Sequence, residues 1–338
     1  MLAVQCGEST LASFCSCPRH ETAEFDFVKL CAPRILSALT LFLWAFALSS
    51  CLKYEQRTQV NADQSGKAMI ELEVASPLVL LAAKMKPKEL AEEMAKGILG
   101  AANGVEAWSD VEYGFTPTGK LKFSGVAYFP DLKEFATGSS GGGTDKMPQL
   151  GEWKSEMVDG KWVIQMDLKM DALGGKKGDP VPADQIEAKI EAQRAEWKTL
   201  KGTVGLFVSE VEMDFSLQVA GKVESVQNLK MTKDDTVSII LSGREILDGL
   251  ETLLMDDDYV RTAMEEGNVD SKGRAIPEGA DIAEILLGGE GPAKVVINPG
   301  EPLFDYETEV AEARAAMSDE LKALIKEGRI LMRKTGES

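Results

Sequence analysis

Strict alternation of apolar and polar residues recurs along this chain, and it limits the folds that the chain can adopt. The residues of Lys67–Ala75 alternate between an apolar side and a charged side, as in a strand with one buried face. The turn-forming cluster Asn61–Gly66 separates this segment from Leu52–Val60, a second predicted strand. We therefore expect a β-hairpin that places one face against a core.

Further strand-like segments follow this hairpin. The predicted strands are Val105–Phe115, Leu121–Phe129, Lys161–Met170, Thr203–Val219, Lys222–Leu229, Thr236–Leu241 and Ala293–Ile297. Within Thr203–Val219 the apolar residues change parity, which predicts a β-bulge near Ser209–Glu210.

Helical periodicity appears between and after the strands. Asp184 is the predicted N-cap of a helix that ends near Trp197 and turns Ile186 and Ile190 inward. The other predicted helices are Ser76–Ala83, one that begins at Pro87, Gly243–Leu254, Tyr259–Glu266, Ile282–Leu287 and Asp305–Glu327.

The order of these elements predicts the fold class. Strands meet at hairpin-length turns, and no regular alternation of strand and helix appears. This predicts an α+β fold: an antiparallel β-sheet with helices packed on one side, and a helical C-terminal part. We expect a β-rich α+β domain over residues 51–242 and a helical region over 243–338 packed on it.

An uncharged apolar run precedes the first predicted strand. It covers Ile35–Leu48, 14 residues, and follows Lys29 and Arg34. A membrane-spanning helix needs about 20 residues, whereas a cleaved signal peptide has a basic start and an apolar stretch of this length. We therefore expect residues 1–50 to be a signal peptide whose first part, residues 1–27, is an N-terminal extension from a mis-called start codon.

The run ends in Leu48-Ser49-Ser50-Cys51, which resembles the lipobox of bacterial lipoproteins. The resemblance implies a diacylglyceryl group on the Cys51 thiol, cleavage before Cys51 and a further fatty acyl chain, such as palmitate, on the new amino end. It also implies an extracytoplasmic protein of the cell envelope that is held on a membrane by lipid. Leu52 is not the acidic residue that is linked to inner-membrane retention, so the outer membrane is favoured in a diderm. The alternative is a soluble α+β protein in which the run is core.

The distribution of cysteine and histidine restricts the chemistry. Every cysteine, at positions 6, 15, 17, 31 and 51, and the single histidine, His20, lie at or before the lipobox. Residues 52–338 therefore cannot support Ser-His-Asp or Cys-His catalysis, histidine metal sites or internal disulfides. We expect no metal and no cofactor. Cys15-x-Cys17 also lacks the usual spacing of a zinc site.

The charge restricts the partners. The chain has 37 basic and 55 acidic residues, and without residues 1–50 the balance is 34 to 51, a net charge of −17. A field of this sign repels nucleic acid. We expect no nucleic-acid partner, and an envelope protein or a glycan as the possible partner.

Three sequence features could support a specific site. Asp256–Asp258 lacks the spacing of a calcium loop, so Asp256 or Asp257 is interpreted as a helix cap. Trp108 lies on the polar parity of its strand and could belong to an aromatic sugar-binding platform with Trp153, Trp162 and Trp197. Paired carboxylates could hydrolyse glycosides without histidine, although so acidic a chain makes any one pair unspecific.

Two stretches of the predicted mature chain resemble LppM-like envelope lipoproteins. The first is Cys51–Gln56 with the turn Asn61–Gly66, where Gln64 replaces a usual glycine, and the second is Phe215–Leu241, which includes Asn228. The resemblance implies an envelope lipoprotein with a β-rich domain and transfers no catalytic residue. We therefore expect a lipid-anchored envelope protein, acylated at Cys51, with a non-catalytic binding or structural role. The alternative from another class is a lipid-anchored, carboxylate-dependent hydrolase.

Overall fold

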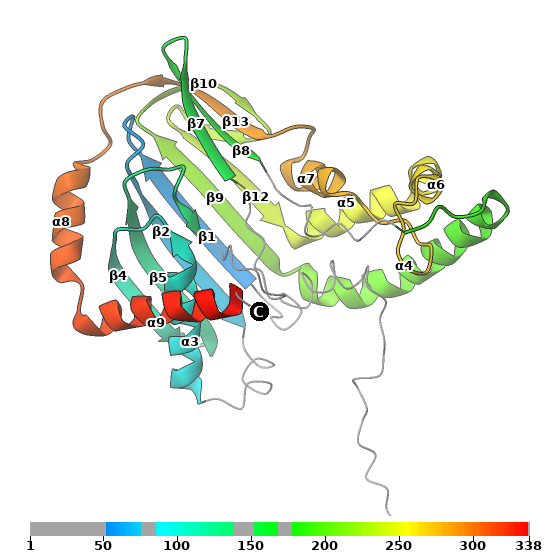
Figure 1. The fold of residues 1–338 in the computed structure, drawn as a ribbon, viewed down its shortest axis with the longest axis horizontal. Helices are drawn as coiled ribbons and strands as arrows, with labels where there is room; N and C mark the ends of the chain where they lie inside the picture. The colour runs from blue at the N-terminus through cyan, green and yellow to red at the C-terminus, as the bar shows by residue number, and fades with distance from the viewer. Residues whose placement is uncertain (1–51, 76–85, 138–151, 168–177, 337–338) are drawn as a thin grey trace, which may run out of the picture. The chain divides into compact units, whose positions relative to one another are not determined.

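The computed structural model describes residues 52–75, 86–137, 152–167 and 178–336. Its strands form sheets of seven, four and two strands, and helices occupy much of the remaining described chain (Figure 1). The fold class is α+β, as predicted. The predicted helix Ser76–Ala83 lies outside the described residues, as does the predicted signal peptide.

The predicted hairpin is confirmed and forms the middle of the seven-stranded sheet. β1 (Leu52–Val60) and β2 (Gly66–Ala75) pair antiparallel, from Leu52 with Val74 to Val60 with Gly66. In the turn, Gln64 has a φ of 76°, in the region that glycine adopts most readily. β5 (Lys120–Phe129) pairs with β2, and β4 (Ala107–Phe115) is one edge of the sheet.

The other side of β1 carries the long-range pairing of the sheet. β9 (Val211–Val219) runs parallel to β1, with Leu52 opposite Val211 and Val60 opposite Val219. β12 (Thr236–Ser242) pairs antiparallel with β9, and β11 (Lys230–Lys233) pairs antiparallel with β12 and forms the other edge of the sheet. The β1–β9 pair is parallel, whereas the other described strand pairs of this sheet are antiparallel. Its paired residues Leu52 and Val211 are 159 positions apart (211 − 52).

A second sheet packs against the first. Its strands are β10 (Gly221–Gln227), β13 (Ala293–Pro299), β8 (Lys161–Asp167) and β7 (Glu152–Val158), in this order. The small third sheet pairs β3 (Ala102–Asn103) with β6 (Ala136–Thr137). β13 comes from the C-terminal part of the sequence, so residues beyond 242 complete a sheet with strands from before it.

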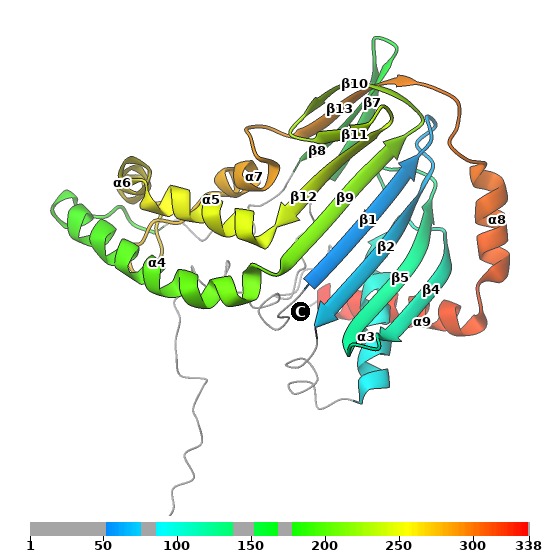
Figure 2. The same cartoon turned by 180° about the vertical axis from the view of Figure 1, so that it is seen from behind.

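One face of the seven-stranded sheet carries the main core. This face meets α3 (Pro87–Ala101), α7 (Gly279–Leu287), α9 (Asp319–Gly336) and the inner side of the four-stranded sheet. Figure 2 views the opposite face, where no described helix lies in front of β9, β1 and β2. The side chains that these strands direct to this face are mostly polar. At its β4–β5 side, α8 (Tyr306–Ala316) packs on Ala107 and Tyr128 through Val310 and Ala313.

Three further helices pack mainly on one another. They are α4 (Ile186–Val208), preceded by the 3₁₀ turn η1 (Ala183–Gln185), α5 (Gly243–Met255) and α6 (Asp257–Glu265). Ile186 and Ile190 of α4 face inward, as predicted, and lie in a small core with residues of α6. Trp197 and Val208 pack on Leu247 of α5 in a second small core.

Several sequence predictions were wrong at the edges of these elements. Thr203–Val208 is the end of α4 and not a strand, because Trp197, Val204 and Val208 lie on one helical face. The predicted bulge near Ser209–Glu210 is therefore a helix-to-strand junction. Asp184 lies within η1 and caps no helix by its side chain.

The predicted helix Asp305–Glu327 is two helices, α8 and α9. They are separated at Ser318, whose hydroxyl accepts a hydrogen bond from the Leu321 amide. A serine that caps a following turn is a recognised helix start, so the sequence contained this signal.

Candidate functional site

The predicted acylation site leads directly into the sheet. Cys51 itself lies outside the described residues, and its neighbour Leu52 is the first residue of β1. Leu52 pairs with Val74 and with Val211 and is 9% exposed. Because consecutive Cα atoms are about 3.8 Å apart, a group on Cys51 would have no flexible tether between it and a paired central strand.

We call the edge of the molecule around this residue the Leu52 end. It comprises Leu52 and Lys53 of β1, the residues aligned with them in the neighbouring strands (Val211–Glu212 of β9, Glu73–Ala75 of β2 and Lys120–Lys122 of β5), the β4–β5 turn Thr116–Gly119, and Lys86–Leu90 at the start of α3. Ala75 pairs with Lys120, which places the β4–β5 turn at the same end of the sheet as the start of β1, with β2 between them. The first turn of α3 belongs here because Leu90 packs on Val74 and Leu121.

The inward side of β1 carries buried polar groups in the middle of the sheet. Gln56 and Thr58 are 5% and 4% exposed. The Tyr54 hydroxyl donates to Gln56 Oε1 at 2.7 Å, and Gln56 Nε2 donates to Thr58 Oγ1 at 3.1 Å. These residues were not predicted as site residues from the sequence. The charged residues Lys53, Glu55 and Arg57 alternate with them along β1, which places Gln56 and Thr58 on the inward side. Satisfied buried polar groups favour one register of the strand.

The outward side of β1 carries a charged cluster. Arg57 Nε donates to Glu55 Oε1 at 2.6 Å, and this bond raises the pKa of Arg57. Asp214 lies opposite Glu55 on β9 and is half-buried. Burial, together with the negative charge of Glu55, raises the pKa of Asp214. The cluster therefore contains a carboxyl group, that of Asp214, that is easier to protonate than an exposed aspartate.

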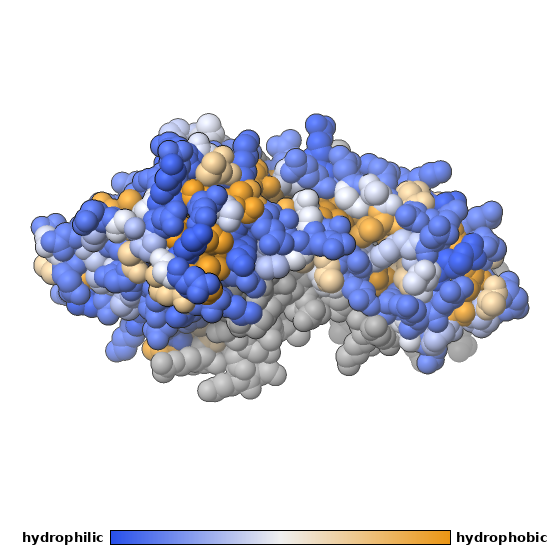
Figure 3. Space-filling model, turned by 90° about the horizontal axis from the view of Figure 1, so that it is seen from above, coloured by the Kyte–Doolittle hydropathy of each residue, from blue (hydrophilic) through white to orange (hydrophobic). Residues whose placement is uncertain are grey.

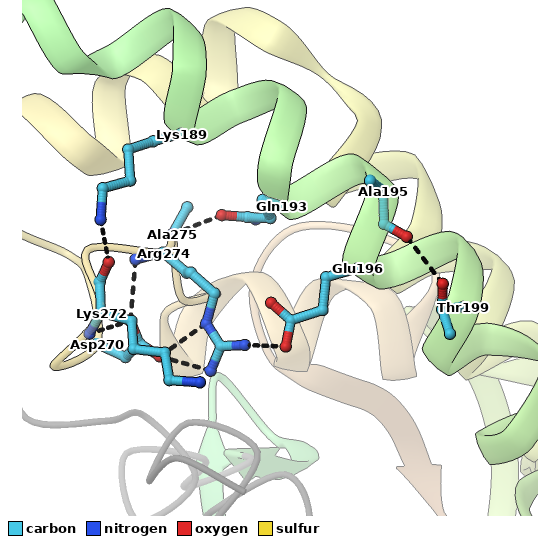
Figure 4. A network of polar contacts seen from close by, with 9 residues as sticks. All are labelled: Lys189, Gln193, Ala195, Glu196, Thr199, Asp270, Lys272, Arg274 and Ala275. Carbon is cyan, nitrogen blue, oxygen red and sulfur yellow. Dashed lines mark hydrogen bonds and ion pairs between the residues drawn. The ribbon is translucent and has the colours of Figure 1, made fainter.

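A second polar network joins α4 to the loop that follows α6 (Figure 4). Asp270 and Arg274 form its centre, with side chains 1% and 11% exposed. Asp270 Oδ2 accepts hydrogen bonds from Arg274 Nε at 2.8 Å and Nη2 at 2.6 Å. Asp270 Oδ1 accepts the backbone amides of Lys272 and Arg274 and closes the turn.

Side chains from one face of α4 form hydrogen bonds with this loop. Lys189 donates to the Lys272 carbonyl oxygen, Gln193 accepts from the Ala275 amide at 2.8 Å, and Glu196 accepts from Arg274 Nη1. Burial would lower the pKa of Arg274, but the bonds to Glu196 and Asp270 raise it. Both carboxylates are occupied by the guanidinium, so the network positions a loop and offers no free acid or base.

Other residues that the sequence marked as site candidates have structural roles. Asp256 is an N-cap, as predicted, and its carboxylate accepts the amides of Asp258 and Tyr259. Trp162 is core, as interpreted from its parity, and its Nε1 donates to Ser155.

The parity of Trp108 in its strand predicted an exposed side chain. Trp108 is instead buried in the main core and is 1% exposed. A register shift between Ser109 and Glu112 moves β4 from one face to the other, which parity counting could not detect. Trp197 is also buried, so the predicted tryptophans do not form an open platform.

Two kinds of feature are absent from the described residues. No group of three or more histidine, cysteine, aspartate or glutamate side chains there is arranged to hold a metal ion. Within the same ranges, no helix combines the length and the apolar composition needed to cross a membrane.

Comparison with known proteins found distant structural similarity alone. No family model matches the chain, and no curated protein matches it in sequence. The chain is similar to the solution structure of the Mycobacterium tuberculosis LppM folded domain, with a TM-score of 0.30 and 10% identity, over 75% of this chain and 93% of that chain. It is also similar to an M1 zinc metallopeptidase from Deinococcus radiodurans, with a TM-score of 0.20 and 9% identity, over 59% of this chain and 44% of that one. Similarity at this level does not establish a shared activity.

Proposed function

We propose that this chain is a bacterial envelope lipoprotein, acylated at Cys51, whose globular part has a non-catalytic binding or structural role. The observation that carries the proposal is the junction at Cys51. The lipobox-like Leu48-Ser49-Ser50-Cys51 ends one residue before Leu52, where β1 begins. A signal peptide that is removed before Cys51 would leave the whole described fold intact.

The chemistry of the site residues supports a non-catalytic role. Residues 52–338 contain neither histidine nor cysteine. The buried carboxylate Asp270 is neutralised by Arg274, and Asp256 is used as a helix cap. These groups stabilise the fold and leave no free nucleophile or base at their positions.

Incorporation of a fatty acid analogue tests the proposal. Cells that express the full chain would be fed an alkynyl fatty acid, and the purified protein would be assayed for label and for its N-terminal mass. We expect label in the wild type and none in Cys51→Ser. Cys31→Ser is the matched control, because it removes a cysteine from the predicted signal peptide and should retain full labelling. Equal labelling of wild type and Cys51→Ser would contradict the proposal.

A carboxylate-dependent hydrolase is the second candidate, and the charged cluster on β1 and β9 is the observation that favours it. A glycosidase uses a pair of carboxyl groups, one of which is protonated, and Asp214, whose pKa is raised, lies opposite Glu55 on the neighbouring strand. Turnover of chromogenic glycosides by the wild type, lost in both Asp214→Asn and Glu55→Gln, would support this function. Turnover that persists in both variants, or is absent from the wild type, would reject it.

A further inference from the structure

We infer that the Leu52 end lies against the lipid bilayer, and that the seven-stranded sheet stands on the membrane with its other end directed away from it. This inference rests on the acylation of Cys51 proposed above. It adds the orientation of the domain and names the bilayer surface as the partner of a defined set of residues.

The absence of a tether is the first argument. Leu52 is paired on both sides, to Val74 and to Val211, so the residue next to the lipid is already held in the sheet. An acyl chain on Cys51 must enter the bilayer within one residue of this point. The remainder of the Leu52 end is therefore brought to the headgroup region, since it lies beside the start of β1.

The charge of the Leu52 end is the second argument. Its described lysines are Lys53, Lys86, Lys88, Lys120 and Lys122, and its described carboxylates are Glu73, Glu89 and Glu212. Lysines thus exceed carboxylates here, whereas residues 51–338 carry a net charge of −17. An acidic domain is repelled by an anionic bilayer except where its local charge is positive.

Two lysines are especially available for lipid phosphates. Lys86 directly precedes α3, and Lys88 is the second residue of this helix. Their side chains are 84% and 86% exposed. Their partners Glu89 and Glu92 lie at 3.6 and 3.7 Å, the range of weak surface pairs. Long lysine side chains can extend to the headgroup level without displacing the fold.

The opposite end is defined by pairs that cross both sheets. These pairs are Val60 with Val219, Gly221 with Pro299, Ile297 with Trp162, and Met157 with Trp162. The β7–β8 turn therefore lies at the level of Val60. With a rise of about 3.3 Å per residue, the nine residues of β1 separate the two ends by about 27 Å.

The far end, at the level of Val60 and the β7–β8 turn, faces away from the membrane in this orientation. Figure 3, seen from above the view of Figure 1, shows hydrophobic areas among hydrophilic ones on the side that carries the β7–β8 turn. Met157 and Val158, next to that turn, are 59% and 42% exposed.

Two turns of the same sheet provide a matched pair of probe sites. Thr118 is exposed in the β4–β5 turn at the Leu52 end, and Ala62 is exposed in the β1–β2 turn at the other end. Residues 52–338 contain no cysteine, so Thr118→Cys and Ala62→Cys each introduce a unique thiol into the acylated protein. Each variant would be labelled with an environment-sensitive fluorophore and reconstituted into vesicles that contain anionic phospholipid and a headgroup-attached quencher.

We expect the label at position 118 to be quenched roughly twofold or more and the label at 62 to be nearly unaffected, because about 27 Å separates the ends. Equal quenching at both positions, or stronger quenching at 62, in protein that floats with the vesicles would overturn the orientation. Protein that carries no lipid and does not float would overturn the proposed function instead.

Charge reversal tests the lysine contact separately. Lys86→Glu with Lys88→Glu should reduce the quenching at position 118, while Lys222→Glu, an exposed lysine of β10 at the far end, should not. Unchanged quenching in the double variant would show that these lysines do not contact the bilayer and would overturn that part of the inference.

Discussion

Gly100 of α3 and Gly328 of α9 are in direct backbone contact. A Cβ atom on Gly100 would lie 2.3 Å from the Gly328 carbonyl carbon, and a Cβ on Gly328 would lie 2.1 Å from the Lys96 carbonyl oxygen. The two helices cross at this point with no side chain between them. α9 therefore approaches α3 this closely only because both positions lack a Cβ.

Alanine at this crossing should separate the helices. We expect Gly100→Ala and Gly328→Ala each to lower the free energy of unfolding by about 1–3 kcal/mol, the usual cost of overpacking. Gly97→Ala is the control in the same helix, since a Cβ there meets nothing within 4 Å. It should raise stability by about 0.5–1 kcal/mol through helix propensity. Urea unfolding of all three variants measures this, and equal effects at positions 97 and 100 would refute the backbone contact.

Asn228 holds the loop between α7 and β13 through one amide group. Its Nδ2 lies within 2.8–3.3 Å of four carbonyl oxygens, those of Gly289, Glu290, Gly291 and Pro292. Asn228 also has a φ of 54°, so glycine is the replacement that removes the side chain without backbone strain.

Asn228→Gly should cost about 1–3 kcal/mol through the unsatisfied carbonyls. Asn228→Asp should cost more at neutral pH, because a carboxylate then faces carbonyl oxygens. These carbonyl oxygens would raise the pKa of the new carboxyl group. The additional loss of stability relative to Asn228→Gly should therefore disappear as the pH falls and the group is protonated. Thermal unfolding at pH 7 and near pH 4 tests this, with Lys230→Ala, at an exposed position of β11, as a neighbouring control. An excess cost that does not depend on pH would contradict the explanation.

The Asp270–Arg274 pair should behave as a buried ion pair. We expect Arg274→Ala to cost about 3 kcal/mol or more, because it leaves Asp270 charged and 99% buried. Arg261→Ala breaks the exposed pair of Arg261 with Glu187 on the same helix α4 and should have little effect. Chemical denaturation compares the two, and similar losses would show that Arg274 is not the structural centre of the loop.

Asp214 and Asp235 should respond to amide substitution with opposite signs. Burial and Glu55 raise the pKa of Asp214, so the folded state binds a proton more readily than the unfolded state, and stability falls as the pH rises through that pKa. Asp214→Asn should therefore increase the melting temperature at pH 7, and the gain should vanish at low pH.

Hydrogen bonds from Gln218 and Thr236 lower the pKa of Asp235. Its contribution is present above the ordinary carboxyl pKa of about 3.9 and is lost as the pH falls through the lower, folded-state pKa. Asp235→Asn should lower the melting temperature at neutral pH. Melting curves from low to neutral pH check both signs, and a shared direction would contradict the assigned environments.

Local patterns in the sequence predicted many elements well. The β1–β2 hairpin, the start of α3 at Pro87, the inward Ile186 and Ile190, and the cap at Asp256 all followed from spacing and turn chemistry. In each case the interacting residues lie within a few positions of one another, so the physical cause was readable along the chain.

The candidate site divides in the same way. The predicted lipobox that ends at Cys51 and the start of β1 at Leu52 are both features of consecutive residues. The Asp270–Arg274–Glu196 network was not predicted, because Glu196 approaches Arg274 only after α4 and the later loop have packed together. Trp108 was misplaced because a local shift of register reversed the face of its strand.

The sequence by itself determined the order and type of most elements, the predicted signal, and the absence of histidine and cysteine after Cys51. Only the tertiary structure decided that β9 pairs parallel with β1, that β13 completes the second sheet, and that Gly100 meets Gly328. Hydrophobic periodicity records which side of an element is buried, since burial is a property of each residue. It does not record the partner that buries it, which depends on the packing of segments more than a hundred residues apart.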